Sequence, residues 1–117
     1  MRRVIVYGTL RKHGIYHHLL RNSEFIKEIV VSGYKMIDLG AYPAAASSKT
    51  SEILCEQYMV DNETFNALDR LEGYPNLYDR ELTMDGWIYY MQPYSSVIKN
   101  GKEIESGDWM HHIKTSK

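Results

Sequence analysis

A glutamate on the apolar side of a predicted helix, Asn62–Glu72, is the first candidate for chemistry. Phe65, Leu68 and Leu71 recur every three residues, which predicts a stripe that faces the core. Glu72 lies four residues after Leu68, so it shares that stripe. Burial and the negative end of the helix dipole both disfavour the ionised carboxylate, so we expect a raised pKa and a general acid/base role. Spacing alone leaves open the alternative that the side chain swings into water.

The tetrapeptide Tyr7-Gly8-Thr9-Leu10 is the second candidate. An apolar run ends here at a glycine, a hydroxyl residue follows, and a short predicted helix comes soon after. Consecutive backbone amides in such a turn can form a concave site for an anion or a carbonyl oxygen, and Gly8 lets a ligand approach the backbone. The alternative is an ordinary turn after a strand. The segment lacks the length of a phosphate-binding or dinucleotide-binding loop.

The other residues that could do chemistry give weaker signals. His13 and His17 have i, i+4 spacing, but Gly14 lies between them and no acidic or cysteine partner is near, so we expect no metal site. His111-His112 lie in a polar segment that is typical of a solvated chain end. Cys55 is the single cysteine, which excludes an internal disulfide, and its apolar surroundings predict a small buried side chain. No Ser or Cys lies in a recognisable nucleophile motif.

Composition limits the kinds of protein that this chain can be. A length of 117 residues allows one small domain, 1–117, with a core over about 4–109 and a polar C-terminal tail. A hydrophobic content of 44% indicates a folded domain. Lys and Arg total 14 against 15 for Asp and Glu, which argues against electrostatic binding of nucleic acid or an anionic membrane. The N-terminal apolar run Val4–Tyr7 is too short for a signal sequence or a membrane span, so we expect a cytoplasmic protein.

Six short strands and two helices are needed to position the two candidates. The expected strands are Val4–Tyr7, Phe25–Val31, Tyr34–Leu39, Ile53–Val60 (with one wet face), Leu82–Met84 and Trp87–Met91. The expected helices are Ile15–Leu20 and Asn62–Glu72, the second capped by Asp61 and ended by Gly73.

The connections complete this picture. We expect turns at Ser32-Gly33 and Asp85-Gly86, the second of type I′, and a closely packed loop over Ala41–Ser48. The chain after Trp109 is expected to fray. With few helices, most connections must be hairpins. The fold class is therefore α+β: a small mixed, mainly antiparallel sheet, closed into a barrel-like shape, with few short helices.

Read together, five segments resemble the γ-glutamylcyclotransferase-like family, which includes AIG2-like proteins and γ-glutamylamine cyclotransferases. They occur in family order across nearly the whole chain. The segments are Val6–Arg11, Gly40–Ala44, Glu56–Val60, Leu68–Pro75 with Tyr78–Arg80, and Ser106–Trp109. The chain departs from the family at Cys55, where the family usually has glycine before the acidic residue.

The resemblance implies a cavity at one end of the barrel-like sheet. It implies that Tyr7, Gly8, Thr9 and Leu10 hold a γ-glutamyl group, that Glu72 is the general acid/base and that Tyr78 is a pocket tyrosine. Arg80 is expected to anchor the structure by pairing with a carboxylate.

The chemistry implied is an intramolecular aminolysis that releases 5-oxoproline and a free amine from a γ-glutamyl compound. It needs no metal and no cofactor. The implied partner is a small-molecule γ-glutamyl substrate, without nucleic acid or membrane, and the chain is expected to be a monomer or a weak homodimer. The leaving amine stays open: glutathione, a γ-glutamyl-amino acid, a γ-glutamyl-ε-lysine and a modified antibiotic all fit. The alternative from another class is a non-catalytic small-molecule-binding or interaction protein that retains the fold.

Overall fold

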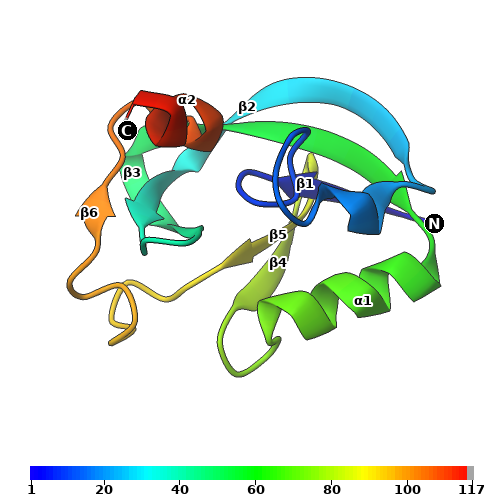
Figure 1. Ribbon diagram of the computed structural model, residues 1–117. Helices are drawn as coiled ribbons and strands as arrows, with labels where there is room; N and C mark the ends of the chain where they lie inside the picture. Colours follow the sequence, from blue (N-terminus) through cyan, green and yellow to red (C-terminus); the bar gives the residue numbers. More distant parts are fainter. Residues whose placement is uncertain (116–117) are drawn as a thin grey trace.

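A six-stranded mixed sheet, curled into a half-barrel, forms the body of the molecule in the computed structural model, which describes residues 1–115 (Figure 1). The strand order is β4-β5-β1-β3-β2-β6, and every neighbouring pair is antiparallel except β1 and β5. The expected fold class is confirmed. The strands are β1 (Arg2–Val6), β2 (Glu24–Asp38), β3 (Pro43–Val60), β4 (Asp79–Thr83), β5 (Gly86–Tyr90) and β6 (Lys102–Glu103).

Two long paired strands, β2 and β3, run side by side as one curved ribbon (Figure 1). The turn expected at Ser32-Gly33 is wrong, because the chain continues there as one strand with a register shift between Ser32 and Tyr34. Gly33 has φ +98°, which allows an irregularity that a side chain would strain. The loop expected over Ala41–Ser48 is also wrong from Pro43 onward, where β3 begins.

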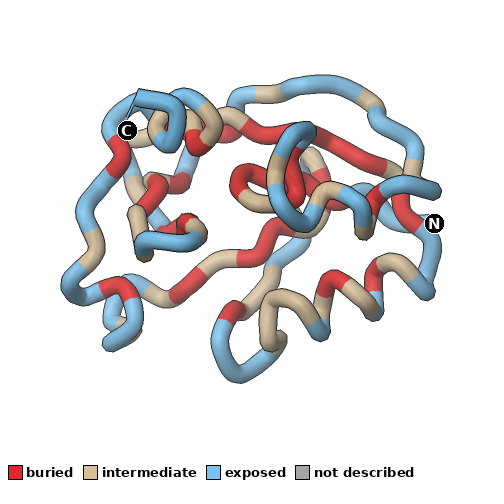
Figure 2. The backbone as a smooth tube through the Cα atoms, viewed as in Figure 1, coloured by how far each residue is buried: buried red, intermediate tan, exposed pale blue. Residues whose placement is uncertain are grey.

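Strand β3 is mostly buried near its two ends, whereas residues 47–52 between them are exposed or half-buried. Ala44, Ala45 and Ala46 are fully buried, and they belong alternately to two apolar clusters on opposite faces. The wet face expected for Ile53–Val60 is absent, since even Glu56 is 4% exposed. Figure 2 shows most of the part of β3 that leads to α1 in red.

Helix α1 (Asn62–Glu72) packs on one face of the sheet through Phe65 and Leu68. Its ends are as the sequence predicts. The Asp61 carboxylate accepts the Thr64 N–H at 2.7 Å, and Gly73 ends the helix with φ +64°.

The β4–β5 hairpin also matches the sequence, but its turn lies one residue earlier than expected. Thr83 pairs with Gly86, so the turn residues are Met84 and Asp85, and neither has the positive φ of a type I′ turn. Gly86 serves a close approach instead, because a Cβ there would lie 2.8 Å from the carbonyl oxygen of Arg3 on β1.

Two short helices complete the described chain. The first, the 3₁₀ helix η1 (His17–Leu20), is shorter than the expected helix Ile15–Leu20. The second, α2 (Trp109–Thr115), replaces the frayed tail expected after Trp109. Trp109 is buried, and the Nε2 atom of His112 lies 2.7 Å from a carboxylate oxygen of Asp38, so this end is not a solvated tail. The last two residues of that tail lie outside the described residues. None of the described helices is long and apolar enough to cross a membrane.

Candidate functional site

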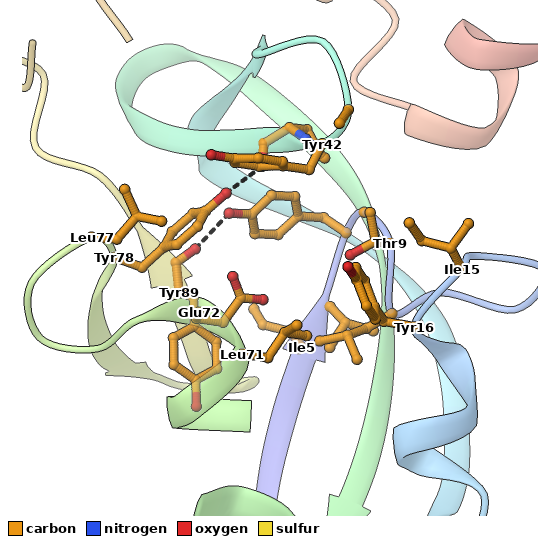
Figure 3. Close-up of a pocket in the computed structure, with 16 residues that line it drawn as sticks. Ile5, Thr9, Ile15, Tyr16, Tyr42, Leu71, Glu72, Leu77, Tyr78 and Tyr89 are labelled. Atoms are coloured by element: carbon orange, nitrogen blue, oxygen red, sulfur yellow. Dashed lines mark hydrogen bonds between the residues drawn. The ribbon is translucent and has the colours of Figure 1, made fainter. Parts of the chain in front are cut away.

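A cavity of about 300 Å³ lies where the end of β1 meets the end of α1 (Figure 3). All six residues singled out in the sequence line it, although they come from segments far apart in the chain. They are Tyr7, Gly8, Thr9, Leu10, Glu72 and Tyr78.

The segment after β1 turns sharply, and three of its backbone amides have no protein partner. The Arg11 N–H donates to the Gly8 carbonyl at 3.0 Å, and the Tyr16 N–H donates to the Thr9 carbonyl at 3.0 Å. Within residues 1–115, the N–H groups of Gly8, Thr9 and Leu10 donate no hydrogen bond to another protein group. Three consecutive donors are thus available to a carboxylate or carbonyl oxygen of a ligand.

Glu72 is the last residue of α1 and brings a carboxyl group into the cavity. Figure 3 shows this carboxyl between Tyr78 on one side and Thr9 and Tyr16 on the other. Burial raises the pKa of Glu72 from 4.5 to about 7. Its carboxyl has no hydrogen bond or ion pair with any described residue, so nothing offsets the loss of hydration. A carboxyl with this pKa exchanges a proton readily at neutral pH.

The tyrosines of the cavity use their hydroxyls to fix the backbone around it. The Tyr78 hydroxyl donates to the Pro43 carbonyl at 2.6 Å, and the Tyr7 hydroxyl donates to the Tyr89 carbonyl at 2.7 Å (Figure 3). Burial is the main cause that raises the pKa of both Tyr7 and Tyr78 above the ordinary value of 10. Both therefore stay protonated and hold the cavity walls.

The sequence did not identify the remaining wall residues. Tyr42 and Tyr89 line the cavity, as do the apolar side chains of Ile5, Ile15 and Leu77. An available signal was the excess of tyrosine, ten against two phenylalanines, which suits a partly polar pocket.

Charge is sparse at this site. Among the residues of 1–115 that line the cavity, Glu72 is the only one of the Asp, Glu, Lys, Arg and His types. Over residues 1–115, no three His, Cys, Asp or Glu side chains gather in a way that could hold a metal ion. The arrangement suits proton transfer to and from a neutral or zwitterionic small molecule.

An ion pair outside the cavity holds α1 against the β4–β5 hairpin. The expected pairing of Arg80 with a carboxylate is confirmed, since its Nε lies 3.0 Å from Asp69. The Tyr89 hydroxyl donates to the same Asp69 oxygen at 2.6 Å, which links the helix that carries Glu72 to a cavity wall. Cys55 is fully buried, as expected, and burial raises the pKa of its thiol to about 12, so it is unreactive.

Comparison with known proteins gives similarity along nearly the whole chain. The sequence profile of the family described as gamma-glutamyl cyclotransferase, AIG2-like, matches residues 4–111. The chain is 32% identical to the gamma-glutamylcyclotransferase family protein YtfP of Escherichia coli (strain K12), over 96% of this chain and 99% of that protein.

Solved structures are also similar to this chain over nearly its whole length. The crystal structure of the uncharacterized protein PH0828 from Pyrococcus horikoshii matches with a TM-score of 0.82 at 29% identity, over 99% of this chain and 96% of that one. The solution structure of ytfP from Escherichia coli matches with a TM-score of 0.71 at 34% identity, over 95% and 98% of the two chains.

Proposed function

The chain belongs to the gamma-glutamyl cyclotransferase, AIG2-like family, and from this premise we propose that it releases 5-oxoproline and a free amine from a γ-glutamyl compound. The observation that carries the proposal is the position of Glu72. A carboxyl whose pKa is raised to about 7 lines the same cavity as three unpaired backbone amides. One group can move protons at neutral pH while the other groups hold the substrate.

The reaction is an intramolecular aminolysis. The substrate's α-amino nitrogen attacks its own γ-carbonyl carbon, and the new C–N bond closes a five-membered ring. The bond from that carbon to the leaving nitrogen then breaks. Because both reacting groups belong to one molecule, the cavity has only to hold a folded conformation in which they meet.

Glu72 supplies the proton transfers in this proposal. As a carboxylate it takes one of the two protons that the α-ammonium nitrogen must lose, and the other proton leaves the ring nitrogen for solvent after attack. As a carboxylic acid it returns that proton to the leaving nitrogen, so the amine departs neutral and Glu72 ends as a carboxylate again. A carboxyl with a pKa near 7 populates both forms at neutral pH, which an ordinary glutamate with a pKa of 4.5 does not.

The amides of Gly8, Thr9 and Leu10 orient the glutamyl part of the substrate. Among residues 1–115, no lysine, arginine or histidine lines the cavity, so the donors that this loop offers to the substrate's oxygens are its N–H groups and the Thr9 hydroxyl. They also stabilise negative charge that develops on the γ-carbonyl oxygen during attack. Tyr78 keeps its hydroxyl on the Pro43 carbonyl and contributes the face of its ring as a wall of the pocket.

The test is a panel of γ-glutamyl compounds that differ in the leaving amine, assayed for 5-oxoproline. Glutathione, a γ-glutamyl-amino acid, γ-glutamyl-ε-lysine and a γ-glutamylated antibiotic cover the amines that the sequence leaves open. We expect 5-oxoproline and free amine in equal amounts from at least one of them. Saturable binding of these compounds without 5-oxoproline would instead identify a non-catalytic binding protein.

A further inference from the structure

A charge network joins three of the segments that resemble the family: Val6–Arg11, Glu56–Val60 and Ser106–Trp109. Its three charged residues have no role in the proposed proton transfer. Arg11 follows Gly8–Leu10 (the glycine loop), Glu56 lies near the C-terminal end of β3, and Asp108 directly precedes α2. The Arg11 Nε donates to Glu56 at 3.1 Å, and its Nη1 donates to Asp108 at 2.9 Å. Arg11 is 5% exposed and Glu56 is 4% exposed. None of the three lines the cavity.

Glu56 also uses its second oxygen. That oxygen accepts the backbone N–H of Lys12 at 2.9 Å and the Tyr58 hydroxyl at 2.8 Å. Two consecutive residues directly after the glycine loop, Arg11 and Lys12, are therefore bonded to one carboxylate on β3. Glu56 is also the register partner of Val6, so its backbone pairs with the strand before the loop while its carboxylate holds the residues after it.

Asp108 extends the network to α2. Its Oδ1 accepts a hydrogen bond from Arg11 and another from the His111 N–H at 3.2 Å. Asp108 therefore caps α2 and binds the Arg11 side chain at the same time. Charges buried at this depth are costly unless they are paired and hydrogen-bonded, and an apolar replacement of similar volume is often as stable. The placement of the Arg11–Glu56–Asp108 network next to Gly8–Leu10 therefore points to a role beyond stability.

We propose that Arg11, held by Glu56 and Asp108, is the positioning residue that fixes the Gly8–Leu10 amides toward the cavity. The Arg11 main chain closes the turn through its N–H on the Gly8 carbonyl, while its side chain anchors that turn to β3 and α2. The Thr9 amide shares a peptide plane with the Gly8 carbonyl that the Arg11 N–H holds, so its direction follows the position of Arg11. The Leu10 amide shares a plane with the Thr9 carbonyl, which the Tyr16 N–H holds from the other end of the turn. The kinetic part of this proposal rests on the proposed function.

Arg11→Lys tests the network with charge conserved. An ammonium group cannot reproduce the planar fork that reaches Glu56 and Asp108 together. We expect kcat/KM for the best γ-glutamyl compound to fall about 10- to 100-fold, as misplacement by about 1 Å can cause, with a higher KM. The midpoint of the pH–rate profile should not move, because Glu72 is untouched. A merely structural role would lower the melting temperature and leave KM of the folded enzyme unchanged.

The matched control is Asp38→Asn. Asp38 pairs with His112 on α2 but does not contact the network, and asparagine keeps the acceptor for the Gly40 N–H. It should lower the melting temperature without raising KM. If Arg11→Lys does not fold, Asp108→Asn replaces it, since Asp108 has a partly exposed side chain and asparagine can still cap α2.

A measurement without turnover separates this inference from the proposed function. Backbone ¹⁵N order parameters of Gly8, Thr9 and Leu10 should be near about 0.85 in the unsubstituted protein and fall toward about 0.6 in Arg11→Lys. Failure of every γ-glutamyl compound would overturn the proposed function, while the order parameters would still decide the positioning role. Unchanged order parameters and an unchanged KM in a folded Arg11→Lys protein would overturn that role.

Discussion

The hydroxyl of Tyr7 donates a hydrogen bond to the main-chain carbonyl of Tyr89 over 2.7 Å, which joins the residue after β1 to β5. The same hydroxyl accepts the N–H of Ala45 on β3 at 2.9 Å. One buried phenol thus satisfies a backbone donor and a backbone acceptor from two further strands. Tyr7 and Tyr89 both line the cavity, so this hydrogen bond lies in the cavity wall.

Replacing Tyr7 with phenylalanine should therefore cost stability. The change removes no ring, but it leaves the buried Ala45 N–H without an acceptor, which costs about 1–3 kcal/mol of unfolding free energy. Urea denaturation followed by circular dichroism measures the difference. Tyr94→Phe is the control, because Tyr94 is 83% exposed and its change should leave the midpoint in place. Equal midpoints for both variants would contradict the role assigned to the Tyr7 hydroxyl.

Gly8→Ala should disturb the cavity through a direct clash. A Cβ at position 8 would lie 2.6 Å from Cγ and 2.8 Å from Cδ of Pro43, so the Pro43 ring must shift. Overpacking of this kind costs about 1–3 kcal/mol. Gly8 does not have positive φ, so the strain comes from this contact rather than from backbone conformation.

The Pro43 side chain supplies the check on that reason. In the double variant Gly8→Ala/Pro43→Ala, the ring atoms that the new Cβ would strike are gone. We expect the double variant to lose less unfolding free energy than the sum of the two single variants, by more than about 0.5 kcal/mol. Additive losses would show that the two positions do not clash.

Local signals allowed much of the fold to be predicted from the sequence. The Asp61 cap, the Gly73 stop and the apolar stripe of α1 act within a few residues, so the sequence alone predicts the helix. The turn of the β4–β5 hairpin was placed one residue late, because Gly86 is needed for an approach to Arg3, which is distant in sequence.

Long-range packing explains the larger errors in the predicted fold. Ala44 to Ala46 have the composition of a loop, yet they form a strand because they pair with β2 and are buried in two apolar clusters. The residues after Trp109 are mostly polar, so the sequence does not predict helix α2. The buried Trp109 side chain and the Asp38–His112 contact hold this helix in place.

For the candidate site, spacing and resemblance selected the six residues that the structure gathers around one cavity. The sequence does not predict that Tyr42 and Tyr89 line the cavity, because only the curl of the sheet brings these residues to it. The Arg11 network was also hidden, since its partners lie 45 and 97 residues away along the chain.

The raised pKa of Glu72 predicts an unusual pH dependence of stability. Between its ordinary pKa of 4.5 and its folded pKa of about 7, the unfolded chain releases this proton while the folded protein keeps it. Stability should therefore fall as pH rises through this window, by about 1.4 kcal/mol for each unit of pKa difference at most. Chemical denaturation of the unsubstituted protein and of Glu72→Gln at pH 5 and at pH 8 measures this. Relative to the unsubstituted protein, the free energy of unfolding of Glu72→Gln should be higher at pH 8 than at pH 5. The same difference in unfolding free energy at both pH values would contradict a raised pKa.

Glu72→Gln should preserve the fold and nearly abolish formation of 5-oxoproline. Glutamine keeps the size and shape of the side chain, but it cannot take up a proton and return it. Loss of general acid/base catalysis typically lowers the rate by about 10²- to 10⁴-fold. The carboxyl has no hydrogen-bond partner among the described residues, so the substitution breaks no contact and circular dichroism should show an unchanged fold.

The pH–rate profile provides the second half of this test. In the unsubstituted enzyme, kcat/KM should rise with pH and level off above about 7, as the carboxylate form of Glu72 that accepts the α-ammonium proton becomes populated. The residual activity of Glu72→Gln should lack that rise, because no group with this pKa remains in the cavity. Glu63→Gln is the control, since Glu63 lies in the first turn of the same helix, and its turnover and profile should match the unsubstituted enzyme. A folded Glu72→Gln protein with near-normal turnover would remove Glu72 from the mechanism and, with it, the main support for this reaction.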